Sequence, residues 1–93
     1  MITASNGAIG FDKAVVTLDD DCTVVTIRRG MLGRKETTIP VSRITMLGWK
    51  HSIAGSGHIE FVAASVDGYV RFAAWKHGEF EVLRDAINAK ITQ

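Results

Sequence analysis

Histidine and cysteine are the residues of this sequence with the clearest capacity for metal binding or catalysis. His58 and Glu60 stand two positions apart, which would place two metal-ligating side chains on one face of a strand. Zinc sites usually need further ligands at motif spacing, such as CxxC or HxxxH, and the sequence contains neither. We therefore interpret both residues as polar positions alternating with Ile59 and Phe61. We expect no metal and no other cofactor.

The single cysteine, Cys22, directly follows the acidic run Asp19–Asp21. Neighbouring negative charges disfavour the thiolate that a nucleophilic cysteine needs. The aspartates lack the pattern of a calcium loop, and the sequence has neither a GxSxG nucleophile motif nor a glycine-rich phosphate loop before a helix. We therefore expect Cys22 to be an unreactive strand residue and the aspartates to form a solvated turn. We expect that the protein is not an enzyme and has no small-molecule substrate. A small enzyme or a metal-binding protein is the disfavoured alternative.

Charge is segregated along the chain, although the formal net charge is only +1. Residues 28–50 carry six cations against one acid, for a local charge of +5, whereas residues 1–27 carry one lysine against four aspartates, for −3. The basic stretch contains a predicted hairpin tip with two apolar residues. The candidate partner-binding residues are Arg28, Arg29, Met31, Leu32, Arg34, Lys35 and Trp49. Such a tip suits either an anionic membrane surface or a protein contact, and a solvated hairpin with both apolar residues folded back is equally open.

Nucleic acid is not an expected partner of this chain. The near-neutral net charge gives no global argument for it, and Phe61 and Phe72 alternate with polar residues as core positions do. Trp49 and Trp75 each precede a lysine near a predicted strand end. Core packing is favoured over exposure for both, because tryptophan is strongly buried on average.

The residues between the turns predict a mainly β domain. Short β-branched or alternating runs are separated by glycine and turn residues, as in antiparallel sheets. The expected strands are Gly7–Phe11, Ala14–Leu18, Cys22–Arg29, Lys35–Ile39, Ile44–Lys50, His58–Ala64 and Tyr69–Ala74. Pro40 cannot donate a ladder hydrogen bond, so the strand that ends there is a candidate edge strand.

The last segment changes from strand to helix periodicity. Phe80, Leu83, Ile87 and Ile91 recur at helical spacing, which predicts an amphipathic helix over Gly78–Thr92. The expected fold is therefore a partly open antiparallel barrel or sandwich of six to seven strands, capped by this helix.

This order of strands and helix, together with several short motifs, resembles a bacterial pleckstrin-homology-like (PH-like) domain family of unknown function. Such domains occur in actinobacterial and phage proteins, sometimes beside a short helical SHOCT segment. The matching stretches cover nearly the whole chain: Gly7–Phe11, VVTIRRG, Lys35–Thr45, Trp49-Lys50, Gly57–Phe61 and Val70–Ile87. The resemblance implies a PH-like fold. Domains of this fold bind phosphoinositides, peptides or other proteins, or self-assemble, and the fold does not decide among these.

Together these features predict a single PH-like domain over residues 1–93 that acts as a non-catalytic protein-interaction or self-assembly module. We expect a cytoplasmic protein, because the lone cysteine suits a reducing compartment and no targeting segment is visible. The expected partner is a second copy of the chain, since an incompletely closed sheet leaves edge strands, and the acidic turn and the basic hairpin could meet between copies. Another protein partner, or anionic lipid headgroups bound through residues 28–35, are the alternatives.

Overall fold

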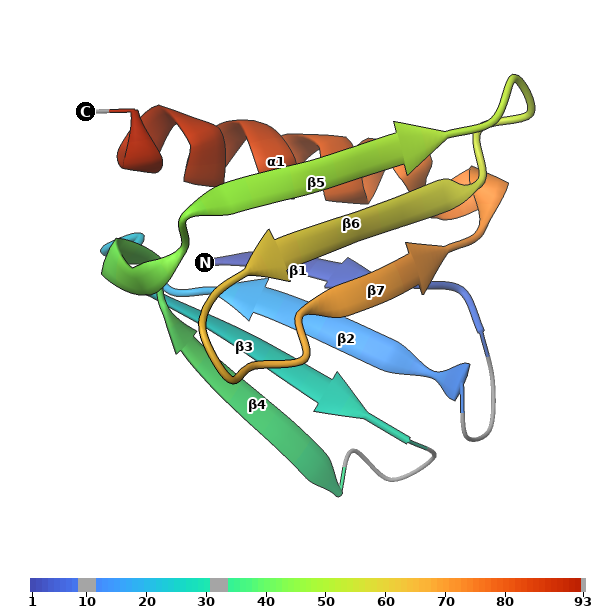
Figure 1. Cartoon of the computed structure of the whole chain (residues 1–93). Helices are drawn as coiled ribbons and strands as arrows, with labels where there is room; N and C mark the ends of the chain where they lie inside the picture. Colours follow the sequence, from blue (N-terminus) through green and yellow to red (C-terminus); the bar gives the residue numbers. More distant parts are fainter. Residues whose placement is uncertain (9–11, 31–33, 93) are drawn as a thin grey trace.

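A computed structural model describes residues 1–8, 12–30 and 34–92, which form two antiparallel sheets and one C-terminal helix (Figure 1). The first sheet has the strand order β1-β2-β3-β4 and the second β5-β6-β7. The strands are β1 (Ile2–Ser5), β2 (Ala14–Leu18), β3 (Val24–Arg29), β4 (Lys35–Pro40), β5 (Met46–His51), β6 (Gly57–Val62) and β7 (Tyr69–Phe72). Two 3-10 helices, η2 (Val41–Arg43) and η3 (Ala74–Lys76), precede β5 and the helix α1 (His77–Ile91). The predicted mainly β sandwich capped by a helix is confirmed.

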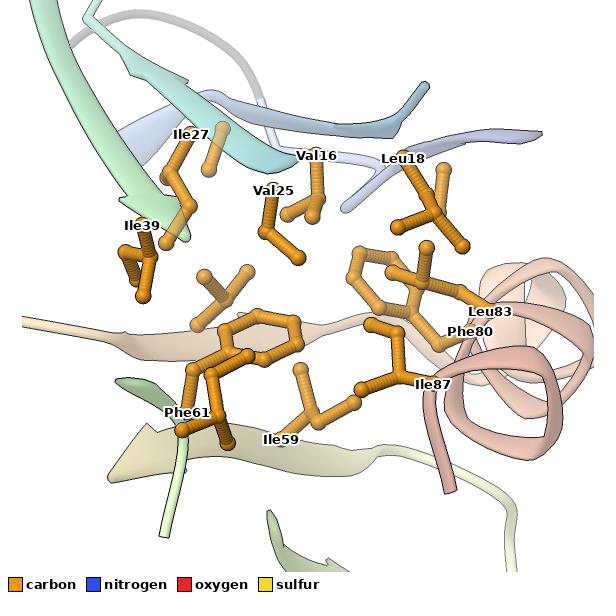
Figure 2. Close-up of a cluster of buried hydrophobic side chains, with 14 of the residues drawn as sticks. Val16, Leu18, Val25, Ile27, Ile39, Ile59, Phe61, Phe80, Leu83 and Ile87 are labelled. Carbon is orange, nitrogen blue, oxygen red and sulfur yellow. The ribbon is translucent and has the colours of Figure 1, made fainter. Parts of the chain in front are cut away.

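The hydrophobic core lies between the two sheets, and α1 closes it at one side (Figure 2). Alternation places one face of each strand inward, so that Val25 and Ile27 of β3 meet Ile59 and Phe61 of β6 across the core. The helix contributes Phe80, Leu83 and Ile87, which are fully buried. These are three of the four residues expected from the helical spacing, and the fourth, Ile91, is partly buried against the core.

Helix α1 is tied to the first sheet at its N-terminal end. Glu79 accepts a hydrogen bond from the backbone N–H of Ser5 at 3.3 Å and forms a 2.9 Å ion pair with Lys76. The hydrogen bond from Lys76 and, to a smaller degree, that from Ser5 hold the pKa of Glu79 below its ordinary value. The first and last elements of the chain are therefore joined directly.

The two sheets meet at Asn6, the one buried polar residue of the described chain. Its side-chain oxygen accepts hydrogen bonds from the N–H groups of Ala8 (3.1 Å) and Ala14 (3.0 Å), and its amide donates to the carbonyl of Asp12 (2.8 Å). Its backbone carbonyl accepts a hydrogen bond from Ala73, which directly follows β7, at 2.9 Å. One residue thus shapes the loop between β1 and β2 and joins that loop to the second sheet.

Three sequence-based expectations are corrected by the structure. The first strand is Ile2–Ser5 and not Gly7–Phe11, because Gly7 adopts a left-handed φ of +80° that ends the extended backbone; residues 9–11 lie outside the described part. Cys22 lies in the turn before β3, also with a positive φ of 57°, and packs partly against the core. Trp75 is 75% exposed, because it falls on η3, beyond the end of β7 and its alternating pattern.

The edge prediction for the strand that ends at Pro40 is confirmed, because β4 is an outer strand of the first sheet. In the described ranges, no helix is long and apolar enough to span a membrane.

Replacing Asn6 with alanine is expected to lower the free energy of unfolding by about 2–4 kcal/mol, because backbone groups that the side chain now satisfies lose their partners. The measurement is chemical denaturation followed by circular dichroism. Asn88→Ala, on the helix, is the matched control and should stay within about 0.5 kcal/mol of the wild type. A similarly small effect of Asn6→Ala would contradict the role assigned to this residue.

Candidate functional site

Four of the seven sequence-predicted site residues lie together at one end of the first sheet. Arg28 and Arg29 end β3, Arg34 precedes β4 and Lys35 begins it. The register of the β3–β4 pair places Arg28 opposite Glu36 and Arg29 opposite Lys35. The expected basic hairpin is therefore present in the fold. Met31 and Leu32, the apolar residues of its tip, lie outside the described residues.

The two neighbouring arginines have different surroundings. Arg28 is 63% exposed and forms a 3.1 Å ion pair with Glu36 across the ladder, where solvent screens the attraction. Arg29 is only 22% exposed and crosses to the second sheet, where its guanidinium donates to the carbonyl of Tyr69 at 2.6 Å. It also lies 3.7 Å from the carboxylate of Asp67. Arg29 therefore fastens the end of β3 to the start of β7, and its guanidinium is largely committed to that structural contact.

Trp49 lies in the second sheet, apart from the basic hairpin. Its ring packs 5.2 Å from that of Phe72 and 5.5 Å from that of His77, and the guanidinium of Arg84 lies 4.5 Å from its centroid. The arginine thus covers the ring in a cation–π arrangement. Trp49 joins α1 to β5, and it lies in the other sheet from the four described candidate residues of the hairpin.

His77 connects the β5–β6 loop to the helix. One ring nitrogen lies 2.9 Å from the carbonyl oxygen of Gly55, and the other lies 2.9 Å from the carboxylate of Glu81. The ring of His51 stands edge-on to it, with 5.0 Å between centroids. In the described part of the chain, no group of three or more histidine, cysteine or acidic side chains is placed to hold a metal ion.

A hollow of about 450 Å³ opens beside the basic hairpin, between the β1–β2 loop, the end of β3 and β7. Three cations line it: Lys13, Arg29 and Arg71. Asp12 is the acid among its lining residues. Sequence reasoning overlooked Lys13 and Arg71 because neither belongs to a run of basic residues: Lys13 follows an acid, and Arg71 stands alone between apolar residues. Because Ala14 pairs with Arg29, the preceding residue Lys13 lies at the same end of the first sheet as the basic hairpin.

The acidic turn lies at the opposite end of the same ribbon. Strands β2 and β3 pair from Ala14↔Arg29 at the basic end to Leu18↔Val25 beside Asp19–Asp21. A five-residue strand separates the two ends by roughly 16 Å. We name Asp19–Asp21 the acidic pole, and Lys13, Arg28, Arg34 and Lys35 the basic pole.

Asp19 stabilises the turn that forms the acidic pole. Its carboxylate accepts hydrogen bonds from the hydroxyl and the N–H of Thr23, both at 2.7 Å, and from the N–H of Val24 at 3.0 Å. The hydroxyl contact first, and then the backbone contacts, hold the pKa of Asp19 below the ordinary value of 3.8. Asp20 and Asp21 are exposed, and Asp20 pairs with the amino group of Met1.

Comparisons with protein-family models, with curated proteins and with solved structures found no match to this chain.

The contrast between Arg28 and Arg29 predicts unequal effects of truncation. Arg29→Ala should lower the free energy of unfolding by about 1.5–3 kcal/mol, because hydrogen bonds from a charged donor between the sheets are lost. Arg28→Ala should cost at most about 1 kcal/mol, as exposed ion pairs do. Urea denaturation of both variants tests this difference. Equal losses would show that Arg29 is an ordinary surface cation.

The lowered pKa of Asp19 predicts an acid-dependent contribution to stability. Because the folded state binds this proton less tightly than the unfolded chain, the contribution is present above pH 3.8 and is lost as the pH falls through the lower folded-state pKa. Asp19→Ala should therefore lower the melting temperature at neutral pH and reduce the loss of stability on acidification. Asp21→Ala serves as the control. Parallel curves for Asp19→Ala and wild type between pH 7 and pH 3 would contradict the assignment.

Proposed function

We propose that this chain is a non-catalytic interaction module that self-associates head to tail, the acidic pole of one copy meeting the basic pole of the next. The observation that carries the proposal is the placement of the two poles at opposite ends of the β2–β3 ribbon. A contact between two different patches repeats from copy to copy, so it yields a ring or a filament according to its rotation.

The exposure of the charges supports this reading. Lys13, Arg34 and Lys35 are exposed, and within the described ranges none of them has an acidic partner within 4 Å. Asp12 and Glu36 lie among the four cations of the basic pole, which leaves it with a positive balance of two (four cations minus two acids). Complementary charges steer association and fix its register more than they raise affinity, so a weak, salt-sensitive contact is expected.

The resemblance to PH-like domains supports an interaction role of this kind. Two sheets followed by one C-terminal helix are the arrangement that the resemblance implies, and binding and self-assembly are activities found on that fold. A lone thiol at Cys22 suits a reducing, cytoplasmic setting. Anionic lipid headgroups at the hairpin 28–35, or a different acidic protein, are the rival partners for the same basic pole.

Complementary charge reversal tests the head-to-tail contact. The variant Arg34→Glu/Lys35→Glu makes both poles acidic, and Asp20→Lys/Asp21→Lys makes both basic, while Asp19 is left to hold its turn. Each variant alone should lose about 1–2 kcal/mol of association free energy, roughly five- to thirty-fold in Kd. An equimolar mixture should associate again, because each copy then meets an oppositely charged pole.

Sedimentation velocity at ~0.05 M and ~0.5 M salt provides the measurement. Wild type should associate at the lower salt and dissociate at the higher. A monomeric wild type at low salt, or a mixture that remains monomeric, would overturn self-association. Salt-sensitive binding to anionic vesicles by that monomer, lost in Arg34→Glu/Lys35→Glu, would then assign the basic pole to lipid.

A further inference from the structure

The outer face of the second sheet carries a row of three basic side chains. The register pairs Lys50 of β5 with His58 of β6, and His58 with Arg71 of β7. Their inward-facing neighbours on β6 and β7, Ile59 and Val70, are buried, so alternation turns the row outward. This row lies on the other sheet from the β3–β4 hairpin, and Arg71 at its end also lines the hollow that Lys13 of the basic pole borders.

The row has no internal charge balance. Within the described ranges, neither Lys50, His58 nor Arg71 has an acidic side chain within 4 Å. The neighbouring row on the same face contains Glu60, which pairs with Gly48. The carboxylate of Glu60 lies above this glycine: a Cβ atom added to Gly48 would be 3.8 Å from its Oε1. A carboxylate at position 58 would pair with both neighbouring cations. An imidazole there leaves both without a counter-charge, an arrangement that sheets usually avoid.

A shallow hollow of about 450 Å³ lies over this row. Besides the three residues of the row, His51 lines it, together with Ser52 and Ser56 of the β5–β6 loop, whose hydroxyls lie 3.2 Å apart. The loop is closed by a 2.8 Å hydrogen bond from the N–H of Ser52 to the carbonyl of Ser56, which holds both hydroxyls at the rim. Hydroxyl, ammonium and guanidinium donors therefore surround one opening.

The central ring of the row is held in place by an aromatic contact. The rings of His58 and Tyr69 lie 4.7 Å apart, tilted by 34°. Tyr69 itself belongs to the strand that Arg29 fastens to the first sheet. The imidazole is thus positioned by the fold, while the flexible Lys50 and Arg71 side chains stand on either side of it, about 10 Å apart at their Cα atoms.

We propose that this row binds a phosphate monoester group, carried by a small molecule or by a lipid headgroup. Such a group has a charge of about −1.5 to −2 at neutral pH and three strong acceptor oxygens. That charge matches the two permanent cations, Lys50 and Arg71. The guanidinium can hold two oxygens in its planar fork, and the ammonium, the imidazole N–H and the serine hydroxyls are the remaining donors.

The first test is a titration with inorganic phosphate, followed by ¹H–¹⁵N NMR at constant ionic strength maintained with sodium chloride. Saturable shifts should centre on Lys50, His58 and Arg71. Arg71→Gln and Lys50→Gln should each weaken binding about tenfold or more. Arg43→Gln removes an exposed cation of η2 that lies in neither pole nor in this hollow, and it should leave the Kd unchanged. Equal weakening by Arg43→Gln, or the absence of a saturable shift, would overturn the proposal.

His58→Glu separates binding from a purely structural role. It should raise the melting temperature in phosphate-free buffer, because the carboxylate supplies the missing counter-charge, and it should abolish the increase in melting temperature that phosphate gives the wild type. A variant that melts lower than the wild type, or that keeps the phosphate response, would show that the row lacks the assigned role.

Vesicles distinguish the two sources of the phosphate group. Phosphatidylcholine vesicles containing phosphatidic acid present a monoester, whereas those containing phosphatidylserine present a diester at matched surface charge. Selective co-sedimentation with phosphatidic acid, displaced by inorganic phosphate, would assign the site to a headgroup. Binding of soluble glycerol 3-phosphate without vesicle binding would assign it to a small molecule. Equal binding to both vesicle types would overturn recognition of a monoester.

Discussion

The buried amide of Asn6 is the interaction on which the arrangement of the two sheets depends. A sandwich whose sheets share no strand must be held together at its corners as well as by its core. Asn6 meets this need because its side chain satisfies two backbone groups of the β1–β2 loop and one at the start of β2, while its backbone carbonyl accepts a hydrogen bond from Ala73 beyond β7. A buried side chain with this many partners fixes one geometry, since any shift would leave polar groups unsatisfied away from water.

The charged surfaces take their positions from this frame. The hydrogen bond between Asn6 and Ala73 and the reach of Arg29 to Tyr69 both hold β7 against the first sheet. Strand β7 in turn presents Arg71 to solvent on the outer face. Arginines that join the sheets and arginines that face solvent are therefore close neighbours here. How far each side chain is buried predicts its role better than its residue type does. Arg28 and Arg29 are adjacent in sequence, yet only the second joins the sheets.

Patterns of alternation and period in the sequence were sufficient to predict the sandwich, the edge strand ending at Pro40 and the buried face of the helix. These features depend on local spacing, which a single sequence displays. The predicted position of the first strand was wrong because the turn at Gly7 depends on the partners of Asn6, which lie up to 67 residues away in the chain. The Lys50–His58–Arg71 row escaped notice for a related reason: its members become neighbours only through strand register.

The hydrogen bond between Ser5 and Glu79 also bears on how the chain folds as it is synthesised. The four strands of the first sheet are complete at residue 40, but their inward faces remain uncovered until β6 and α1 have left the ribosome. Because translation adds residues from the N-terminus, the nascent sheet exposes Val16, Val25 and Ile27 while it waits for Phe80 and Leu83. Closure of the core is therefore a late step in folding, and chaperones that shield apolar strands have their opportunity in the interval before it.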